Sequence, residues 1–181
     1  MTLQQLCHKH GYIIDDNNRD AVTQISNYLT SGETKGLLLL GYYGTGKTWL
    51  MKLVNKLTPV RLVSTERIIN DTIANGGIPT NYTKENFIYH FDVEKSVGIE
   101  KEYPFCFDEL GGQNDRKLNI WGNEIYPMSV ILKAHYEKNI KCHAITNYSS
   151  EDLVKLYGGE VIDRFKEMFL FVKFKGGSRR K

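Results

Sequence analysis

Cysteine is scarce in this sequence of 181 residues, and long apolar runs are missing. The three cysteines, Cys7, Cys106 and Cys142, are far apart, odd in number and never part of a Cys-x-x-Cys pair. This pattern argues against disulfides and against structural zinc. No stretch approaches the roughly 18 consecutive apolar residues of a membrane span, and the N-terminus lacks a signal-peptide pattern. We therefore expect a cytoplasmic protein with no membrane partner.

The sequence also lacks a large excess of charge of one sign. The formal net charge is +3, but residues 173 to 181, "KFKGGSRRK", contain five basic residues and no acid, so the rest of the chain carries about −2. This balance gives only weak support for binding to phosphate backbones. The usual meaning of such a basic tail is solvation.

Residues 1 to 35 are expected to form an N-terminal helical segment on or beside a core that spans residues 36 to 181. The stretch "CHKH" at 7 to 10 contains residue types that bind metals, but adjacent residues rarely converge on one ion, so an exposed helix or arm is favoured. Apolar residues at helical spacing predict an amphipathic helix over 19 to 31, after the possible caps Asn17 and Asn18.

Short apolar runs recur along the core. "LLLL" at 37 to 40 is bounded by glycines, as is typical of a strand buried on both faces of a parallel sheet. Similar runs follow at 60 to 63, 105 to 107, 142 to 145 and 169 to 174, with helical patterns between most of them. The alternation predicts an α/β fold of one domain, with a mainly parallel five-stranded sheet flanked by helices.

The segment from 66 to 100 is harder to interpret. A helix is expected over about 65 to 75, whereas "FIYHFDVEK" at 87 to 95 fits either a strand or a short helix.

The strongest motif is "GYYGTGKTWL" at 41 to 50, between the "LLLL" run and an amphipathic helical pattern that ends before Pro59. It fits Gly-x-x-x-x-Gly-Lys-Thr, the P-loop or Walker A motif. Glycines let backbone N–H groups surround phosphates, the lysine neutralises them, and the threonine hydroxyl holds Mg²⁺. This predicts ATP and Mg²⁺ as cofactors, with the cofactor-binding residues Gly41, Gly44, Thr45, Gly46, Lys47, Thr48 and Trp49.

A pair of carboxylates follows another apolar run in "YPFCFDELGG" at 103 to 112. Ligands bind where strands of a parallel sheet end, so Asp108 is predicted to steady Mg²⁺ together with Thr48. Glu109 is then placed to orient the water that attacks the γ-phosphate. The acidic stretch "HFDVEK" at 90 to 95 is a weaker rival for this position.

Two further residues complete the candidate catalytic set of Lys47, Glu109, Asn147 and Arg164. Asn147 follows the run at 142 to 145, where an amide can contact a phosphate and a water, although it could equally be a turn residue. The neighbouring Ser149 and Asp152 have the spacing of a helix-capping box. Arg164 lies on the flank of a short helical pattern and is either a surface ion-pair partner or an arginine finger for a neighbouring subunit.

Together, "GYYGTGKT", "FCFDEL", "ITN", "IDRF" and the terminal "GGSRR", with Gly176, Ser178 and Arg180, resemble the AAA+ ATPases of the DnaC/IstB group. The resemblance covers about residues 36 to 180. It implies that Asn147 is the sensor 1 residue, that Arg164 acts in trans, and that ATP assembles a homo-oligomer. Members of that group lack the helical lid of larger AAA+ proteins, for which this chain also leaves no room.

The resemblance further implies a replicative helicase or a transposase as partner, and binding to single-stranded DNA. Candidate DNA contacts are Arg116, Lys117 and Trp121, because cations beside an aromatic ring suit stacked bases. An ordinary polar loop with a packing tryptophan explains them equally well. Only about 35 residues precede the core, too few for the separate partner-binding domain of many helicase loaders.

The function favoured by the sequence is a slow Mg²⁺-dependent ATPase of the helicase-loader type, in DNA replication or a mobile element, stimulated by assembly or DNA. The alternatives are an IstB-like transposition helper and a nucleotide-dependent binding switch that hydrolyses little ATP. A small-molecule kinase is disfavoured, because the Asp-Glu and Thr-Asn pairs fit water activation better than an acceptor pocket.

Overall fold

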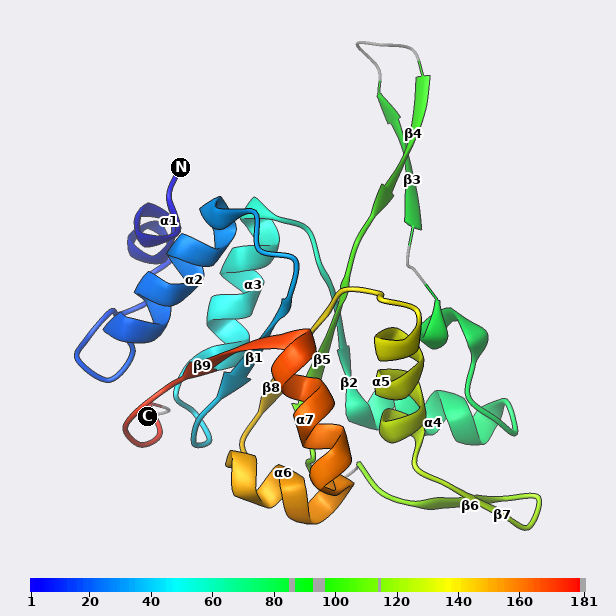
Figure 1. The fold of residues 1–181 in the computed structure, drawn as a ribbon. Helices are drawn as coiled ribbons and strands as arrows, with labels where there is room; N and C mark the ends of the chain where they lie inside the picture. Colours follow the sequence, from blue (N-terminus) through cyan, green and yellow to red (C-terminus); the bar gives the residue numbers. More distant parts are fainter. Residues whose placement is uncertain (85–86, 93–96, 114, 180–181) are drawn as a thin grey trace.

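The computed structural model describes residues 1–84, 87–92, 97–113 and 115–179, with only the backbone described for 87–92 and 97–102. Its centre is a sheet in the order β2-β5-β8-β1-β9, in which every neighbouring pair is parallel (Figure 1). The strands are β1 (Gly36–Leu40), β2 (Arg61–Ser64), β5 (Phe105–Leu110), β8 (Cys142–Thr146) and β9 (Phe169–Lys173). The predicted α/β fold with a mainly parallel five-stranded sheet is confirmed.

The apolar run of β1 is buried on both faces of this sheet. Successive strand residues point to opposite faces, so Leu37 and Leu39 join one hydrophobic cluster while Leu38 and Leu40 join the other. All four side chains are buried. A central parallel strand needs such a continuous apolar run because helices cover it on either side.

Helices cover the two faces in two groups. One cluster joins α1 (Leu3–Lys9), α2 (Arg19–Ser31) and α3 (Lys47–Leu57) to the sheet. The other joins α4 (Thr65–Ala74), α5 (Pro127–Glu137), α6 (Ser150–Tyr157) and α7 (Gly159–Met168) to the opposite face. The result is a three-layer arrangement in which every strand-to-helix loop opens at the carboxyl edge of the sheet.

The N-terminal helices pack directly on the core. The predicted helix over 19 to 31 is confirmed as α2, but the side chain of Asn18 does not cap it. It instead accepts from the Asp15 N–H and donates to the Ile13 carbonyl, which fixes the preceding loop. Cys7 on α1 is buried, so the expectation of an exposed helix at 7 to 10 is wrong for that residue. The domain boundary after residue 35 stays a prediction.

Two antiparallel hairpins and a short 3-10 turn lie outside the main sheet. They are η1 (Thr80–Thr83), β3 (Phe87–Asp92) with β4 (Val97–Glu102), and β6 (Leu118–Ile120) with β7 (Asn123–Ile125). The stretch left open between strand and helix is thus a strand over 87–92, while residues 93–95 lie outside the described part. Figure 1 shows the β3–β4 hairpin extending away from the main sheet. The described part of the rival acidic stretch, residues 90–92, therefore belongs to this hairpin and not to the main sheet.

Among the described residues, we find no helix with the length and apolar character that crossing a bilayer requires.

Candidate nucleotide-binding site

The glycine-rich loop connects the end of β1 to the start of α3, as the motif requires. Gly44 has a φ of +71° and Gly46 a φ of +93°, the left-handed region that favours glycine. A Cβ atom on Gly44 would lie 2.3 Å from the Ser178 hydroxyl oxygen. The loop conformation and the chain packed against it therefore both require glycine, and α3 begins directly after it, where a helix N-terminus favours an anion.

Lys47 lies at the centre of the loop, and its side chain is buried. Its Nζ donates to the carbonyls of Gly41 and Tyr42, at 2.5 and 2.8 Å. It also donates to Oδ1 of Asn147 at 2.8 Å, across 100 positions of sequence. The structure thus brings together two predicted site residues, and places a cation where the loop surrounds it with acceptors.

Asn147 reaches Lys47 because of the strand order. It directly follows β8, which lies between β1 and β5 in the sheet. The neighbouring Thr146 donates its hydroxyl to the Leu110 carbonyl at 2.7 Å, which ties the end of β8 to that of β5. Ser149 and Asp152 form the predicted capping box at the start of α6, so they have a structural role.

Thr48 and Asp108 meet at the same edge. The Thr48 hydroxyl donates to Oδ1 of Asp108 at 3.3 Å, and the Glu109 N–H donates to the same oxygen at 2.9 Å. Burial raises the pKa of Asp108, while the bond from Thr48 opposes the rise. A hydroxyl and a carboxylate are the hard oxygen ligands that Mg²⁺ takes alongside water and phosphate. The donor set therefore fits a magnesium ion.

Glu109 has an unusual backbone. Its φ is +62°, uncommon for a residue other than glycine, and the pairing of β5 with β8 shifts register between Phe107 and Leu110. Bonds from the Thr65 hydroxyl and the Gly112 N–H to its carbonyl, at 3.1 and 2.9 Å, hold this conformation. The bulge leaves the Glu109 side chain exposed at the mouth of the site. Costly backbone conformations of this kind concentrate at functional sites.

These residues share one pocket of about 370 Å³, within the size range of small-molecule sites. It is lined by Gly11, Tyr12, Ile13, Tyr43, Gly44, Thr45, Gly46, Lys47, Thr48, Trp49, Asp108, Glu109, Asn147 and Arg179. Gly41 contributes its carbonyl to Lys47. Gly11 to Ile13, which carry no motif, were not among the predicted site residues. Neither was Arg179, although Ser178 and Arg180 on either side of it were singled out. Arg180 lies outside the described residues.

Arg164 is placed elsewhere. Of the residues that the structure describes, those lining the pocket do not include it. Its guanidinium pairs with Glu160 and lies 5.3 Å from the ring centre of Tyr136, between α7 and α5. The side chain is 28% exposed. In this position it pairs within its own helix and is not part of the pocket of its own chain.

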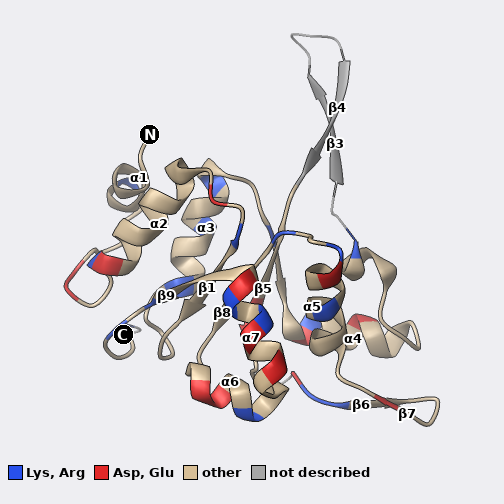
Figure 2. Cartoon of the chain, viewed as in Figure 1, with Lys and Arg blue, Asp and Glu red and all other residues tan. Residues whose placement is uncertain are grey.

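The candidate DNA-contacting residues lie on or beside the β6–β7 hairpin. Trp121 is 88% exposed at its tip, with a φ of +53°, and Lys117 pairs with Glu124 across the strands. Figure 2 shows basic residues directly before β6 and an acidic one on β7. Because its charges are mixed, the hairpin alone does not form a basic surface for nucleic acid.

No protein-family model matches the sequence, and no curated protein matches it either. Solved structures do match. One titled as the DnaC helicase loader is 21% identical, with a TM-score of 0.62, covering 90% of this chain and 92% of that one. A structure titled DnaI is 16% identical, with a TM-score of 0.57, covering 90% and 87%.

A third similar structure, AMPPCP-bound DnaA from Aquifex aeolicus, is 14% identical with a TM-score of 0.55. The match covers 96% of this chain but 50% of that one. At these identities the likeness shows the fold alone, and the chain has the fold of the structures titled DnaC helicase loader and DnaI.

Proposed function

We propose that the protein binds ATP with Mg²⁺ in this pocket and hydrolyses it. The observation that carries the proposal is the bond between Lys47 and Asn147. It joins the glycine-rich loop to the end of β8, in the same pocket as the Thr48–Asp108 pair. The glycine-rich loop and the ends of β5 and β8, three segments distant in sequence, thus converge on one pocket at the N-terminus of α3, where phosphate is favoured.

Each residue has a distinct task in this proposal. Phosphate oxygens would replace the loop carbonyls as acceptors for Lys47, with the backbone N–H groups around Gly44 and Gly46 as further donors. Thr48 and Asp108 would hold Mg²⁺, which supplies charge neutralisation at the β- and γ-phosphates. The exposed carboxylate of Glu109 would accept a hydrogen bond from the attacking water, and Asn147 would orient the γ-phosphate or that water.

We further propose that the competent form is a homo-oligomer assembled by ATP. Arg164 lies outside the pocket of its own chain and between two helices, so its charge would serve a neighbouring subunit. The guanidinium would have to exchange Glu160 for a γ-phosphate at the subunit interface. An arginine supplied in trans stabilises the charge that develops during phosphoryl transfer.

The biological role we favour is that of a loader-type ATPase in DNA replication or a mobile element. Its support is the fold, because a structure titled as a helicase loader matches this chain over nearly the full length of both. The partners would be a replicative helicase or a transposase, and single-stranded DNA. A transposition helper or a binding switch with little hydrolysis would use the same pocket.

The test is ATP hydrolysis by the purified protein over a series of protein concentrations, with and without single-stranded DNA, alongside its mass in solution. We expect turnover to rise more than linearly with protein concentration. We expect Glu109→Gln to retain ATP binding but to lower turnover roughly 100-fold or more.

A matched control is Glu151→Gln, an exposed carboxylate on α6 that is absent from the described lining of the pocket. It should leave turnover unchanged. Equal turnover by Glu109→Gln and the native protein would contradict the role of Glu109. ATP binding without turnover or assembly would favour the binding switch.

A further inference from the structure

Three segments from different parts of the chain meet at the mouth of the pocket. They are the N-terminal segment, residues 11–18, the glycine-rich loop, residues 41–48, and the C-terminal tail, residues 174–179. The tail follows β9 and runs beside both others. Its Lys175 N–H donates to the Asn17 carbonyl at 2.9 Å, and its Arg179 N–H donates to the Gly44 carbonyl at 3.0 Å.

Arg179, at the end of the tail, contacts both of the other segments. Its Nη1 donates to the Ile13 carbonyl at 2.8 Å, and its Nη2 forms an ion pair with Asp15. The Arg179 side chain is 25% exposed and that of Asp15 is 44% exposed, so this pair is partly shielded from solvent. The Asn17 N–H, followed by Arg179, holds the pKa of Asp15 below its ordinary value.

The N-terminal segment forms one wall of the pocket. Tyr12 is 4% exposed, and its ring packs edge-on against Trp49 at 5.4 Å between centroids. A Cβ atom on Gly46 would lie 3.1 Å from the Tyr12 ring, so the two segments are in close contact. The Ile13 carbonyl accepts from Arg179 and from Asn18. The position of this wall therefore depends on the C-terminal tail.

The wall has a defined place relative to the proposed ligand. Phosphates would occupy the end of the pocket at Lys47, Thr48 and Asp108. The sugar and base must then extend along the remaining lining, which includes Gly11 to Ile13, Trp49 and Arg179. Aromatic and apolar side chains with a few polar groups are typical of such a subsite.

We infer that Arg179 and Asp15 form a clasp that holds the N-terminal segment against the nucleoside end of the ATP site. Arg179 is a positioning residue in this inference, which rests on the proposed function. Without the clasp, the wall at residues 11–13 loses its attachment to the tail. Part of the free energy of ATP binding is then used to order this segment. Affinity then falls, while the water-activating groups at the other end of the pocket are unchanged.

The experiment measures ATP binding by calorimetry and by the fluorescence of Trp49. The chain has two tryptophans, so a Trp121→Phe background assigns the signal to Trp49. We expect Arg179→Ala to raise the Kd for ATP roughly tenfold, the size expected for losing a charge-assisted hydrogen bond. Turnover at saturating ATP should stay within about twofold, as for loss of uniform binding.

Asp15→Ala should raise the Kd for ATP as Arg179→Ala does, and the double variant should be no weaker than either single one, because the two residues act as a pair. Arg179→Lys, which keeps the charge, should recover part of the affinity. The matched control is Lys175→Ala. Lys175 pairs with Asp20 at 3.0 Å and so also joins the tail to the N-terminal region, but it is not among the described lining residues.

The outcomes separate the two claims. If the native protein fails to bind ATP, the proposed function is overturned, and the clasp with it. If it binds ATP but Arg179→Ala and Asp15→Ala bind equally well, the clasp alone is overturned. The clasp alone is also overturned if Lys175→Ala weakens ATP binding as much as Arg179→Ala does. It is likewise overturned if Arg179→Ala lowers turnover while it keeps the affinity for ATP. Thermal unfolding of each variant identifies any that fail to fold, in which case Arg179→Lys and Arg179→Gln decide.

Discussion

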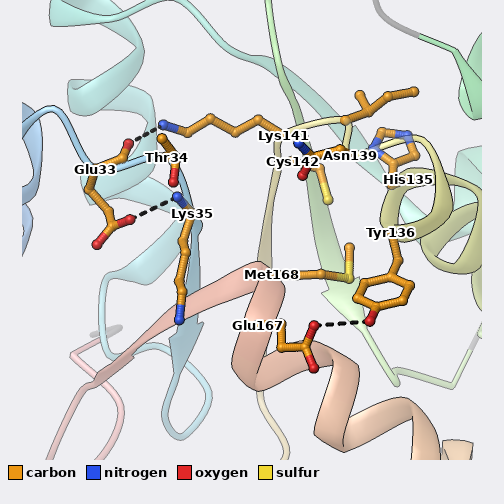
Figure 3. A pocket seen from close by; sticks show the side chains of 11 residues that line it. Glu33, Thr34, Lys35, His135, Tyr136, Asn139, Lys141, Cys142, Glu167 and Met168 are labelled. Atoms are coloured by element: carbon orange, nitrogen blue, oxygen red, sulfur yellow. Dashed lines mark hydrogen bonds between the residues drawn. The ribbon is translucent and has the colours of Figure 1, made fainter.

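The two ends of the central sheet each carry a polar cavity, and the larger one is at the amino end. That cavity has a volume of about 660 Å³ and lies among the residues that precede β1 and β8 and the last turns of α5 and α7 (Figure 3). Three of the polar side chains that line it form hydrogen bonds with other residues of the same cavity wall or of the helix beside it. Lys35 donates to the Lys166 carbonyl at 3.0 Å, Lys141 to the Glu33 carbonyl at 2.8 Å, and Tyr136 to Glu167 at 2.9 Å.

The cavity at the carboxyl end is smaller, and it differs in which end of a helix lies beside it. Helix α3 begins there, whereas α5 and α7 end at the amino edge. The N-terminus of a helix favours anions and its C-terminus favours cations. Lys35 therefore places its charge at the C-terminus of α7, while Lys47 adds its charge to the N-terminus of α3. The direction of the helices, and not the cavity volume, therefore distinguishes the end of the sheet that favours an anion such as phosphate.

Replacing one lysine at each end tests this comparison most strongly. Lys47→Ala should abolish ATP binding and lower kcat/KM at least about 1,000-fold, because it removes the central cation of the phosphate site. Lys35→Ala should change neither by more than about twofold. Calorimetry with ATP and steady-state hydrolysis measure both. Equal effects of the two variants would contradict the assignment of the ATP site to the carboxyl end of the sheet.

Arg164 is not among the described residues that line either cavity. Its proposed role is at the interface with a neighbouring subunit. Arg164→Ala should keep ATP binding but lose turnover by on the order of 100-fold, the effect of removing a charge supplied in trans. Mixing it with Lys47→Ala subunits should restore part of the hydrolysis, since each supplies what the other lacks. Absence of any recovery across all mixing ratios would argue against a finger in trans.

His143 tests whether the amino end serves stability. Its Nδ1 accepts from the Leu37 N–H at 3.0 Å, and burial, then nearby Lys141, lowers its pKa to about 3. The unfolded chain keeps the ordinary pKa of about 6.5. The folded state therefore takes up its proton only at lower pH, and stability present above pH 6.5 is lost as pH falls toward 3.

Each such histidine contributes up to about 1.4 kcal/mol per pH unit over that range. Urea unfolding at pH 7, 6 and 5 measures the free energy of unfolding. This free energy should decline less with falling pH for His143→Asn than for the native protein, because the Asn amide keeps an acceptor for the Leu37 N–H. A decline as steep as that of the native protein would exclude His143 as a cause. His135, whose pKa is also lowered by burial, accounts for a remaining slope.

Replacing Asp108 gives the smallest expected effect on the free energy of unfolding. Here the substitution should stabilise the fold instead of destabilising it. Burial raises its pKa, so the ionised form costs folding free energy at neutral pH. Asp108→Asn should therefore stabilise the protein without metal by about 1 kcal/mol. Mg²⁺ with ATP should raise the melting temperature of the native protein but much less that of the variant. Destabilisation by Asp108→Asn in the absence of metal would contradict this account.

Much of the fold follows from local patterns. Five apolar runs correspond to the five strands of the main sheet, and the helix over 19–31 follows from its spacing. The errors have physical reasons. Asn18, one of two possible caps, does occupy the N-cap position, but its side chain bonds the loop before the helix. Cys7 is covered by core packing that its own sequence neighbours do not reveal.

The sequence by itself determined the strand, the glycine-rich loop and the helix that follows it, because glycine spacing and apolar periodicity act over a few residues. Only the tertiary structure decided that β8 lies between β5 and β1, which brings Asn147 to Lys47. It also decided that Arg179 meets Ile13, a contact across 166 positions. Such contacts depend on strand order and chain path, which leave no repeating pattern in the sequence.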